Sequence, residues 1–190
     1  MKLALAIPSC GTIKSSTVFC LIRLIKNLKC DFVVLMQEGS IVHRNREMLV
    51  KAAFEQQCTH ILFIDSDMYF EGDAANRLTA HEKAVVGVNY FHRKLPKITT
   101  VHMEAEKKKN LATIAPLGFT TCDSVATGFL LIDLEVFKKL SHPWFFWESD
   151  KEGEVETGED YWFCRKAREA GFEIWVDLTI PIGHIGDYRY

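Results

Sequence analysis

The sequence lacks the features that mark secreted, membrane-spanning or nucleic-acid-binding proteins. No apolar run approaches the ~20 residues that cross a bilayer. The run 3–7 ends at Pro8 and is shorter than the roughly 7 to 15 apolar residues of a signal-peptide core. The formal net charge of -2 over 190 residues provides no positive field for nucleic acid or an anionic membrane. We therefore expect a cytoplasmic protein with no transmembrane segment and no nucleic-acid partner.

Closely spaced cysteine pairs, which bind zinc or form redox-active disulfides, are also missing. None of the six cysteines occurs as Cys-x-x-Cys, which argues against a zinc ribbon and a thioredoxin-like site. We expect them to be reduced and mostly buried. The sequence contains no internal repeat and no linker, and its 48% hydrophobic and 25% charged residues are ordinary for a globular protein. The length suits a single domain covering 1–190.

What the sequence does contain is an apolar run that ends abruptly in two carboxylates. Residues 61–64 are all apolar and predict a strand buried on both faces. Asp65 and Asp67 follow it, where open α/β sheets bind their ligands. Two oxygen donors suit a hard divalent cation, and the cation in turn suits a phosphate. The alternative is that one aspartate caps a helix or forms a turn.

The first half of the chain alternates strands and helices. Strands are predicted over 3–7, 32–36, 61–64 and 84–88, with helices from about Ser15 to Leu28 and over 45–57 and 73–81. The apolar face of the first helix is expected to comprise Val18, Leu21, Ile22, Ile25 and Leu28. Such alternation implies a parallel sheet with right-handed crossovers.

The second half is less regular. Residues 96–102 and 112–116 predict short antiparallel strands or irregular structure, and the acidic stretch 148–160 predicts a loop. A buried strand over 129–132 precedes a helix over 134–140 that Asp133 can cap. A helix over 160–170 is stopped by Gly171, and 174–176 gives the last strand.

Four motifs occur in an informative order: Asp-Ser-Asp at 65–67, Thr-Gly-Phe at 127–129, Gly-Glu-Asp-x-x-Phe at 158–163, and Gly-His at 183–184. Together they resemble the GT-A class of nucleotide-sugar glycosyltransferases over nearly the whole chain. The resemblance implies an α/β fold with a GT-A, Rossmann-like mixed sheet, mainly parallel and flanked by helices. It also implies a single domain with a nucleotide-binding half, 1–90, and an acceptor-side half, 91–190.

The activity that the resemblance implies is metal-dependent transfer of a sugar from a nucleotide-sugar donor to a glycan or other hydroxyl acceptor. The donor would be a UDP-sugar or, second, a GDP-sugar, and the enzyme a hexosyl- or deoxyhexosyltransferase. Mn2+ or Mg2+ would stabilise the departing diphosphate as a Lewis acid. Asp67 would bind the metal, with His184 and Asp65 as further ligands, although a histidine in a Gly-flanked segment is otherwise more often structural.

The acceptor hydroxyl must lose a proton in such a reaction. In inverting members of the class the Asp of the Glu-Asp pair is the general base, which makes Asp160 the candidate and Glu159 the alternative. Two carboxylates at a helix start also suit the helix dipole, and both roles can hold at once. A retaining enzyme would need no base on that face.

The resemblance assigns further residues to the donor. The nucleotide would contact Pro8, Ser9, Gly11, Glu38, Arg44, Asn45, Asp65 and Ser66. The donor or acceptor sugar would contact Arg93, Thr127 and Gly128. Arg44 could equally be a surface charge, and Gly128 could serve only a tight turn.

Three other activities compete with this interpretation. A nucleotidyltransferase of related fold would place a glycine-rich phosphate loop after the first strand, and 10–14 is a poor version of one. A phosphatase of the Asp-x-Asp type would carry its aspartates after the first strand. A sugar- or nucleotide-binding module could have lost the chemistry. The chain ends six residues after His184 with no long acceptor domain, so we expect a homo-oligomer or a partner domain to complete the acceptor side.

Overall fold

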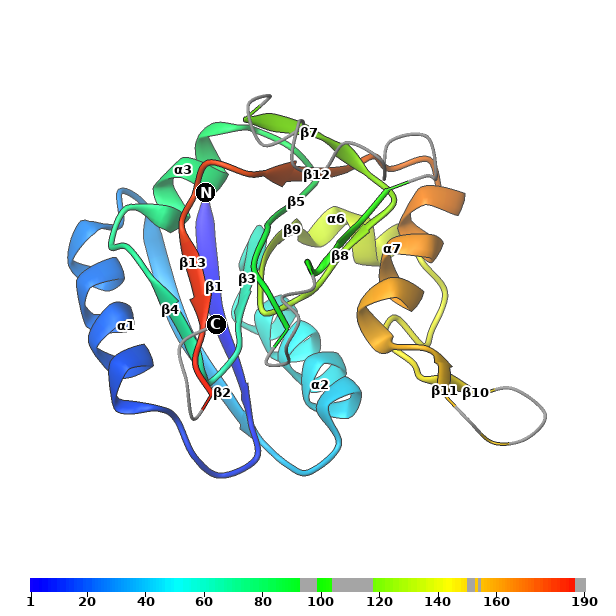
Figure 1. The fold of residues 1–190 in the computed structure, drawn as a ribbon, viewed down its shortest axis with the longest axis horizontal. Coiled ribbons are helices and arrows are strands. Elements are labelled where there is room, and N and C mark those ends of the chain that lie inside the picture. The colour runs from blue at the N-terminus through cyan, green and yellow to red at the C-terminus, as the bar shows by residue number, and fades with distance from the viewer. Residues whose placement is uncertain (93–98, 104–117, 150–152, 154, 187–190) are drawn as a thin grey trace.

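A mixed α/β sheet with helices on both faces forms the body of the molecule (Figure 1). The computed structural model describes residues 1–92, 99–103, 118–149, 153 and 155–186. The central sheet has seven strands in the order β2-β1-β3-β9-β5-β12-β7. Their bounds are β1 (Lys2–Ser9), β2 (Asp31–Glu38), β3 (His60–Ile64), β5 (Val85–Val88), β7 (Phe119–Cys122), β9 (Phe129–Asp133) and β12 (Ile174–Asp177).

Helices and short strand pairs complete the fold. Among the described residues the helices are α1 (Ser15–Asn27), α2 (Val42–Glu55), α3 (Ala74–Ala80), α6 (Leu134–Lys139) and α7 (Glu159–Glu169). In the same part of the chain, three antiparallel pairs lie outside the central sheet: β4 (Met68–Phe70) with β13 (Ile182–His184), β6 (Val101–His102) with β8 (Ser124–Val125), and β10 (Glu148–Ser149) with β11 (Val155–Thr157). None of the helices in the described part of the chain has the length and apolar character needed to cross a bilayer.

Strand direction confirms the predicted fold class. β1 pairs in parallel with β2 and β3, and β12 pairs in parallel with β5. β9 is antiparallel to both β3 and β5, and β7 is antiparallel to β12. The strands β2, β1, β3, β5 and β12 therefore point the same way, so the sheet is mixed and mainly parallel.

The core is split by the sheet into two layers. Leu3 and Leu5 face the layer that contains α1 and α3, whereas Ala4 and Ala6 face the layer that contains α2, α6 and α7. The apolar residues of β3 are 0% exposed, which confirms that this strand is buried on both faces. A strand covered on both sides holds its end rigidly, and Asp65 follows that end.

The expected apolar face of α1 was partly wrong. Leu21 is buried, but Val18 is 40% and Ile22 is 47% exposed. The buried side is rotated toward Thr17, Cys20 and Leu24. The physical reason is that the apolar arc of this helix is wider than the surface on which it packs, so part of the arc faces solvent.

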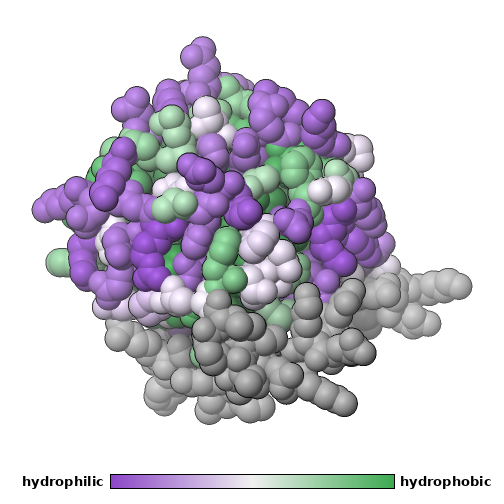
Figure 2. Space-filling view, turned by 90° about the horizontal axis from the view of Figure 1, so that it is seen from above, coloured by the Kyte–Doolittle hydropathy of each residue, from purple (hydrophilic) through white to green (hydrophobic). Residues whose placement is uncertain are grey.

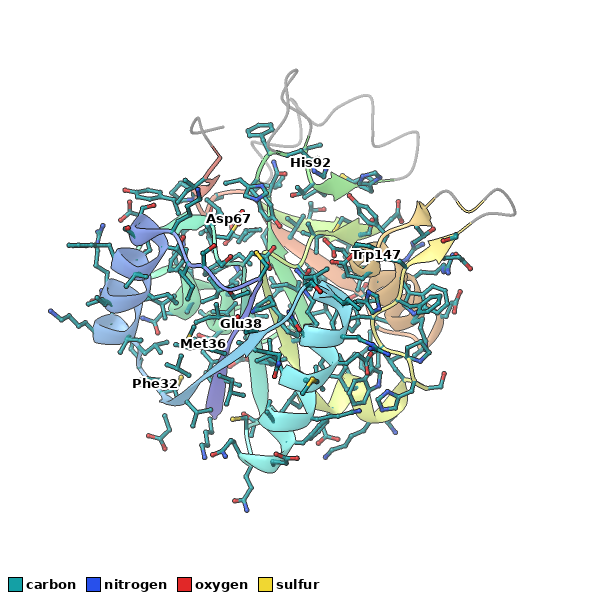
Figure 3. All side chains as sticks on the ribbon, turned by 90° about the horizontal axis from the view of Figure 1, so that it is seen from below. Phe32, Met36, Glu38, Asp67, His92 and Trp147 are labelled. Atoms are coloured by element: carbon teal, nitrogen blue, oxygen red, sulfur yellow. The ribbon has the colours of Figure 1, made fainter. Side chains whose placement is uncertain are left out.

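The edge strand β2 exposes apolar side chains on the same face. Phe32 and Met36 are 37% and 59% exposed and point outward along β2 (Figure 3). The register pairs Phe32 with Leu3, and Leu3 belongs to the core layer of α1. The exposed row of β2 therefore lies on the α1 face of the sheet.

Two further expectations can be compared with the structure. The stretch 148–160 is not only a loop, because β10 and β11 pair within it and α7 begins at Glu159. Within 96–102 the structure has β6, while 112–116 lies outside the described residues. Four of the six cysteines are buried and all are free, as expected.

Candidate functional site

A pocket of about 330 Å3 lies where β1, β2 and β3 end. Because these strands are parallel, their carboxyl ends meet at one edge of the sheet. The volume falls at the small end of the range for ligand pockets. The lining residues are Pro8, Ser9, Cys10, Thr12, Lys14, Gly39, Ser40, Val42, Asn45, Asp65, Ser66, Asp67 and His184. Seven of the predicted site residues are in this list: Pro8, Ser9, Asn45, Asp65, Ser66, Asp67 and His184.

The loop after β1 is folded by its own polar groups. Ser9 Oγ donates to the carbonyl of Thr12 at 3.0 Å and accepts from the amide of Gly11 at 3.0 Å. Gly11 has a φ of +107°, and a Cβ there would lie 3.3 Å from Glu38 Oε1. Gly11 and Glu38 thus lie side by side at the ends of β1 and β2 but do not line the pocket themselves.

Asn45 joins the ends of β1 and β2. Its side chain is buried, and Nδ2 donates to the carbonyls of Gly39 at 2.8 Å and Ser9 at 3.3 Å. This residue therefore shapes the wall of the pocket. Its neighbour Arg44 is exposed and lines a different cavity, together with Glu47 and other residues of α2.

Asp67 and His184 meet through the pairing of β4 with β13. The register aligns His184 with Met68, and the amide of Ile185 donates to the carbonyl of Asp67 at 2.7 Å. His184 Nε2 lies 3.3 Å from Asp67 Oδ1, and each side chain is 15% exposed. Nδ1 of His184 lies 3.3 Å from the carbonyl oxygen of Phe91, which leaves Nε2 directed at the carboxylate.

This pair fits a divalent cation only in part. Within the described ranges, no three His, Cys, Asp or Glu residues are grouped as metal ligands. Asp67 and His184 can offer one oxygen and one nitrogen. A hard cation bound there would need phosphate oxygens and water to complete its coordination, as Mg2+ commonly does in phosphate sites.

Asp65 is engaged by Arg46, a residue that the sequence did not single out. Arg46 lies in α2, is only 2% exposed, and contacts Asp65 Oδ1 at 2.9 Å and Glu159 Oε1 at 2.5 Å. Burial acts to lower the pKa of Arg46, but the carboxylates of Asp65, Asp160 and Glu159 raise it above its ordinary value. A permanently charged guanidinium therefore links the end of β3 to the start of α7.

Asp160 occupies the first turn of α7 and is held by Thr127. The amide and hydroxyl of Thr127 each lie 3.2 Å from the Asp160 carboxylate and donate to it. Burial, with the nearby charges of Glu159 and Asp65, raises the pKa of Asp160 to about 7, although Arg46 acts in the opposite direction. A carboxyl group with this pKa can accept a proton near neutral pH.

Glu159 differs from its neighbour. Burial acts to raise its pKa, but Arg46 and the indole of Trp147 hold the pKa below its ordinary value. Trp147 Nε1 donates to Glu159 Oε2. Glu159 is therefore an ionised anchor, whereas Asp160 can gain or lose its proton.

Gly128 closes the floor between these groups. Its carbonyl accepts from the amide of Asp65 at 2.9 Å, and its own amide donates to the hydroxyl of Tyr90 at 2.9 Å. A Cβ at Gly128 would collide with the Tyr90 hydroxyl and lie 3.1 Å from Asp65 Oδ2. Glycine is required here by the close approach of its neighbours.

The predicted residues thus form two neighbouring groups. Around Asp67 lie the pocket residues, and around Asp160 lie Glu159, Thr127 and Gly128, with Arg46 between the groups. Arg44 lies apart, and Arg93 is outside the described residues.

Sequence reasoning missed Arg46, Tyr90 and Lys14. Arg46 shares a helix face with Leu49 and Val50, three and four residues later, and that spacing could have revealed its burial. Lys14 lines the pocket, and its amide donates to the carbonyl of Ser66 at 2.9 Å. Tyr90 had no local signal, because its role depends on the close approach of Gly128.

Comparison with known proteins gives a fold and no family. No family model matches the sequence, and no curated protein matches it in sequence. Among solved structures, A197 from STIV has a TM-score of 0.69 at 19% identity, over 98% of this chain and 87% of that one.

Two structures solved with UDP are also similar. TarS 1-349 of S. aureus in complex with UDP has a TM-score of 0.57 at 15% identity, over 94% of this chain. GalNAc-T7 with UDP, GalNAc and Mn2+ has a TM-score of 0.54 at 13% identity, over 96% of this chain. This chain spans 58% of the TarS chain and 37% of the GalNAc-T7 chain. The protein therefore has a fold of the GT-A type, a mixed sheet flanked by helices.

Proposed function

We propose that this protein is a glycosyltransferase that moves a sugar from a nucleoside-diphosphate-sugar, a UDP-sugar first and a GDP-sugar second, to a hydroxyl acceptor with inversion. One observation carries the proposal. A pocket containing the Asp67–His184 pair is linked through Asp65, Arg46 and Glu159 to a half-buried carboxyl group, Asp160, whose pKa is raised to about 7. The fold supports it, because two structures of similar fold were solved with UDP.

The donor would occupy the pocket at the ends of β1 and β3. Its nucleoside would lie along Pro8 and Ser9, and its diphosphate near Asp67, where Lys14 supplies a positive charge. Asp67 and His184 would hold a divalent cation, Mn2+ or Mg2+, between the protein and the diphosphate. That cation would stabilise the negative charge of the leaving group.

The acceptor side would be served by Asp160. The bond between the anomeric carbon and the diphosphate oxygen breaks, and its electron pair leaves with the diphosphate. The acceptor oxygen forms the new bond to the anomeric carbon, and its proton passes to the Asp160 carboxylate. Thr127 holds this carboxylate in position through two hydrogen bonds.

Arg46 would hold the donor pocket and the candidate base in a fixed position relative to each other. It contacts Asp65, which lines the donor pocket, and Glu159, which precedes the base in the sequence. Because the guanidinium is planar and its donors are fixed, it holds both carboxylates at defined positions. Gly128 would form part of the floor beneath the donor sugar, where its missing Cβ leaves room for the Tyr90 hydroxyl and Asp65.

Donor hydrolysis tests the proposal. The protein is incubated with a panel of UDP- and GDP-sugars and Mn2+, and release of free sugar and nucleoside diphosphate is followed. We expect slow hydrolysis of at least one donor, abolished by Asp67→Ala. Asp31→Ala is the matched control, because Asp31 is exposed and lies at the opposite end of β2 from the pocket.

The competing activities give different products. Consumption of nucleoside triphosphates with release of pyrophosphate, in the absence of donor hydrolysis, would identify a nucleotidyltransferase. Binding of UDP without turnover of any donor, with or without added hydroxyl acceptors, would identify a module that keeps the fold without the chemistry.

A further inference from the structure

Two exposed aromatic side chains lie near the start of α7, the helix that carries the candidate base. Phe146 and Trp147 are each 43% exposed. The preceding residues, Trp144 and Phe145, are buried at 6% and 0% exposure. In the segment 144–147, the first two aromatic side chains are packed in the core and the next two face solvent. Large exposed apolar groups in a well-anchored segment mark surfaces that bind a partner or ligand.

The segment is fixed by Glu47 of α2. Glu47 Oε1 accepts from the amide of Trp144 at 2.5 Å and from the amide of Phe145 at 2.8 Å. These bonds tie the segment to the helix that also carries Arg46. Phe146 and Trp147 are therefore held in place before any ligand arrives, which lowers the entropic cost of binding.

Trp147 is directed toward the first turn of α7. Its indole nitrogen donates to Glu159, the residue before Asp160. The rest of the ring is half exposed and offers an apolar face. In Figure 3, Trp147 and Asp67 are separated laterally. The aromatic surface is therefore distinct from the donor pocket and lies on the side of the base.

A second cavity adjoins Phe146. It has a volume of about 530 Å3 and is lined by Phe146, His43 and charged residues of α2, including Arg44 and Lys51. The ring of His43 lies 6.3 Å from that of Phe146 and 5.6 Å from that of Trp147. His43 thus connects the cavity with the aromatic surface beside Glu159.

We propose that Trp147, Phe146 and this cavity form the acceptor subsite and that the acceptor is an oligosaccharide. The inference rests on the proposed function. The apolar face of one sugar ring would stack on Trp147, which would bring a hydroxyl of that ring to Asp160. Further sugar units would follow Phe146 into the cavity, where the side chains of Arg44 and Lys51 can donate hydrogen bonds to their hydroxyls.

The chemistry of the surface favours a neutral glycan. Sugars combine apolar C–H faces with many hydroxyls, so they suit a site with aromatic walls and a few polar groups. Its charges include both signs, because Glu47 lies beside Arg44 and Lys51. A polyanion such as nucleic acid would favour a uniformly positive surface. The cavity volume of about 530 Å3 leaves room for more than one sugar unit.

Saturation-transfer NMR tests the subsite directly. Wild-type protein with UDP and the diamagnetic cation Mg2+ is titrated with maltotriose, cellotriose, chitotriose and mannotriose. We expect at least one trisaccharide to receive saturation and to bind with an affinity that Trp147→Ala lowers on the order of tenfold. Phe146→Ala should weaken binding less, because Trp147 would still stack on the first ring. Phe19→Ala is the control, since Phe19 is a 72% exposed aromatic on α1.

Each outcome decides the proposal. Equal affinity of wild type and Trp147→Ala would overturn it, as would failure of all four trisaccharides to bind a wild-type protein that hydrolyses a donor. If Trp147→Ala is not folded by circular dichroism, Phe146→Ala carries the test, and unchanged affinity of this variant would overturn the proposal. Saccharide binding that depends on Trp147 without donor hydrolysis would keep the subsite and reject the transferase.

Discussion

Arg46 provides the positive charge that balances the carboxylates at the centre of the site. It is 2% exposed and contacts two carboxylates that belong to different elements. Replacing it with Met would leave Asp65 and Glu159 partly buried without their counter-charge. We expect Arg46→Met to lower the free energy of unfolding by about 3–5 kcal/mol, the usual cost of breaking a buried pair from one side.

The midpoint of urea unfolding measures this loss. Arg23→Met is the matched control, because Arg23 pairs with Glu71 on the surface and the two side chains are 52% and 43% exposed. We expect this control to cost at most about 1 kcal/mol. Equal midpoints for the two variants would contradict the central role of Arg46.

Asp67 is expected to control metal-dependent nucleotide binding. Its carboxylate lies 3.3 Å from His184 Nε2 and lines the pocket. We expect Asp67→Ala to abolish the binding of UDP that requires Mn2+, because one of the two proposed protein ligands of the cation would be lost. Isothermal titration calorimetry with UDP, with and without Mn2+, measures the effect. An affinity equal to that of the wild type in Mn2+ would exclude Asp67 as a ligand.

Asp160 should set the pH dependence of transfer. The carboxyl faces Arg46, Glu159 and Asp65, and its pKa is raised to about 7. Only the ionised form accepts a proton, so kcat/KM should rise ~10-fold per pH unit below neutrality and level off above it. Glu159 stays ionised throughout this range, since its pKa is lowered. A flat profile between about pH 5 and about pH 9 would eliminate Asp160 as the base.

The same group predicts a change in stability that needs no substrate. Between its ordinary pKa of 3.8 and about 7, Asp160 binds more protons in the folded than in the unfolded state. Its contribution to the free energy of unfolding therefore falls as pH rises through this window. We expect Asp160→Asn to raise the thermal midpoint relative to wild type at pH values above about 7 more than at acidic pH. A constant difference between the two proteins across pH would contradict the raised pKa.

Among individual site residues, the sequence predicted those whose type is itself informative. Asp65, Asp67 and the Glu159–Asp160 pair stand out because charged groups directly follow an apolar run or open a helix. Arg46 did not stand out, because arginine on a helix is usually solvated and its burial depends on two partners far away in sequence.

At the scale of elements, two short strands bring site residues together in a way that the sequence pattern does not reveal. β4 and β13 are three residues each, too short for the alternation of apolar and polar residues to be recognised. Their pairing nevertheless brings His184 to Asp67 across more than half of the chain. The motif order suggested that these residues meet, but only the β4–β13 pair explains how.

The turn before β9 gives a prediction of its own. Gly128→Ala would push a methyl group into the Tyr90 hydroxyl and toward Asp65. We expect the shift to lower the free energy of unfolding by about 1–3 kcal/mol, as overpacking usually does. Gly158→Ala is the control, because a Cβ there meets nothing within 4 Å. Thermal midpoints of both variants measure the difference, and equal midpoints would refute the close approach.

Helix α1 and strand β2 show where an apolar pattern leads to a wrong prediction of burial. The apolar residues of α1 and β2 exceed what the core can cover, so Val18, Ile22 and Met36 remain exposed. Periodicity tells which residues could be buried. It does not tell how wide the packing surface is, because this depends on the neighbouring elements.

At the scale of the molecule, the alternation of elements was sufficient to predict an α/β sheet. Each of the strands predicted over 3–7, 32–36, 61–64, 84–88, 129–132 and 174–176 is present in the central sheet. The alternation could not predict that the strand at 129–133 lies between β3 and β5 and runs antiparallel to both. Strands that follow one another in sequence need not be neighbours in a sheet, so neither the place nor the direction of this strand could be read from its order in the chain. The similar structures add the fold type, at identities too low to add a substrate.

The position of β9 has a consequence for how the chain is made. β9 lies between β3 and β5, although both of those strands precede it by tens of residues in the sequence. While the ribosome is still synthesising residues before 129, β3 lacks one of its two neighbours in the sheet and β5 lacks both, β9 and β12. We expect a fragment of residues 1–90 to remain protease-sensitive and a fragment extended beyond β12 to become resistant, a difference that limited proteolysis of stalled nascent chains measures. Resistance of the 1–90 fragment would show that this half folds without β9.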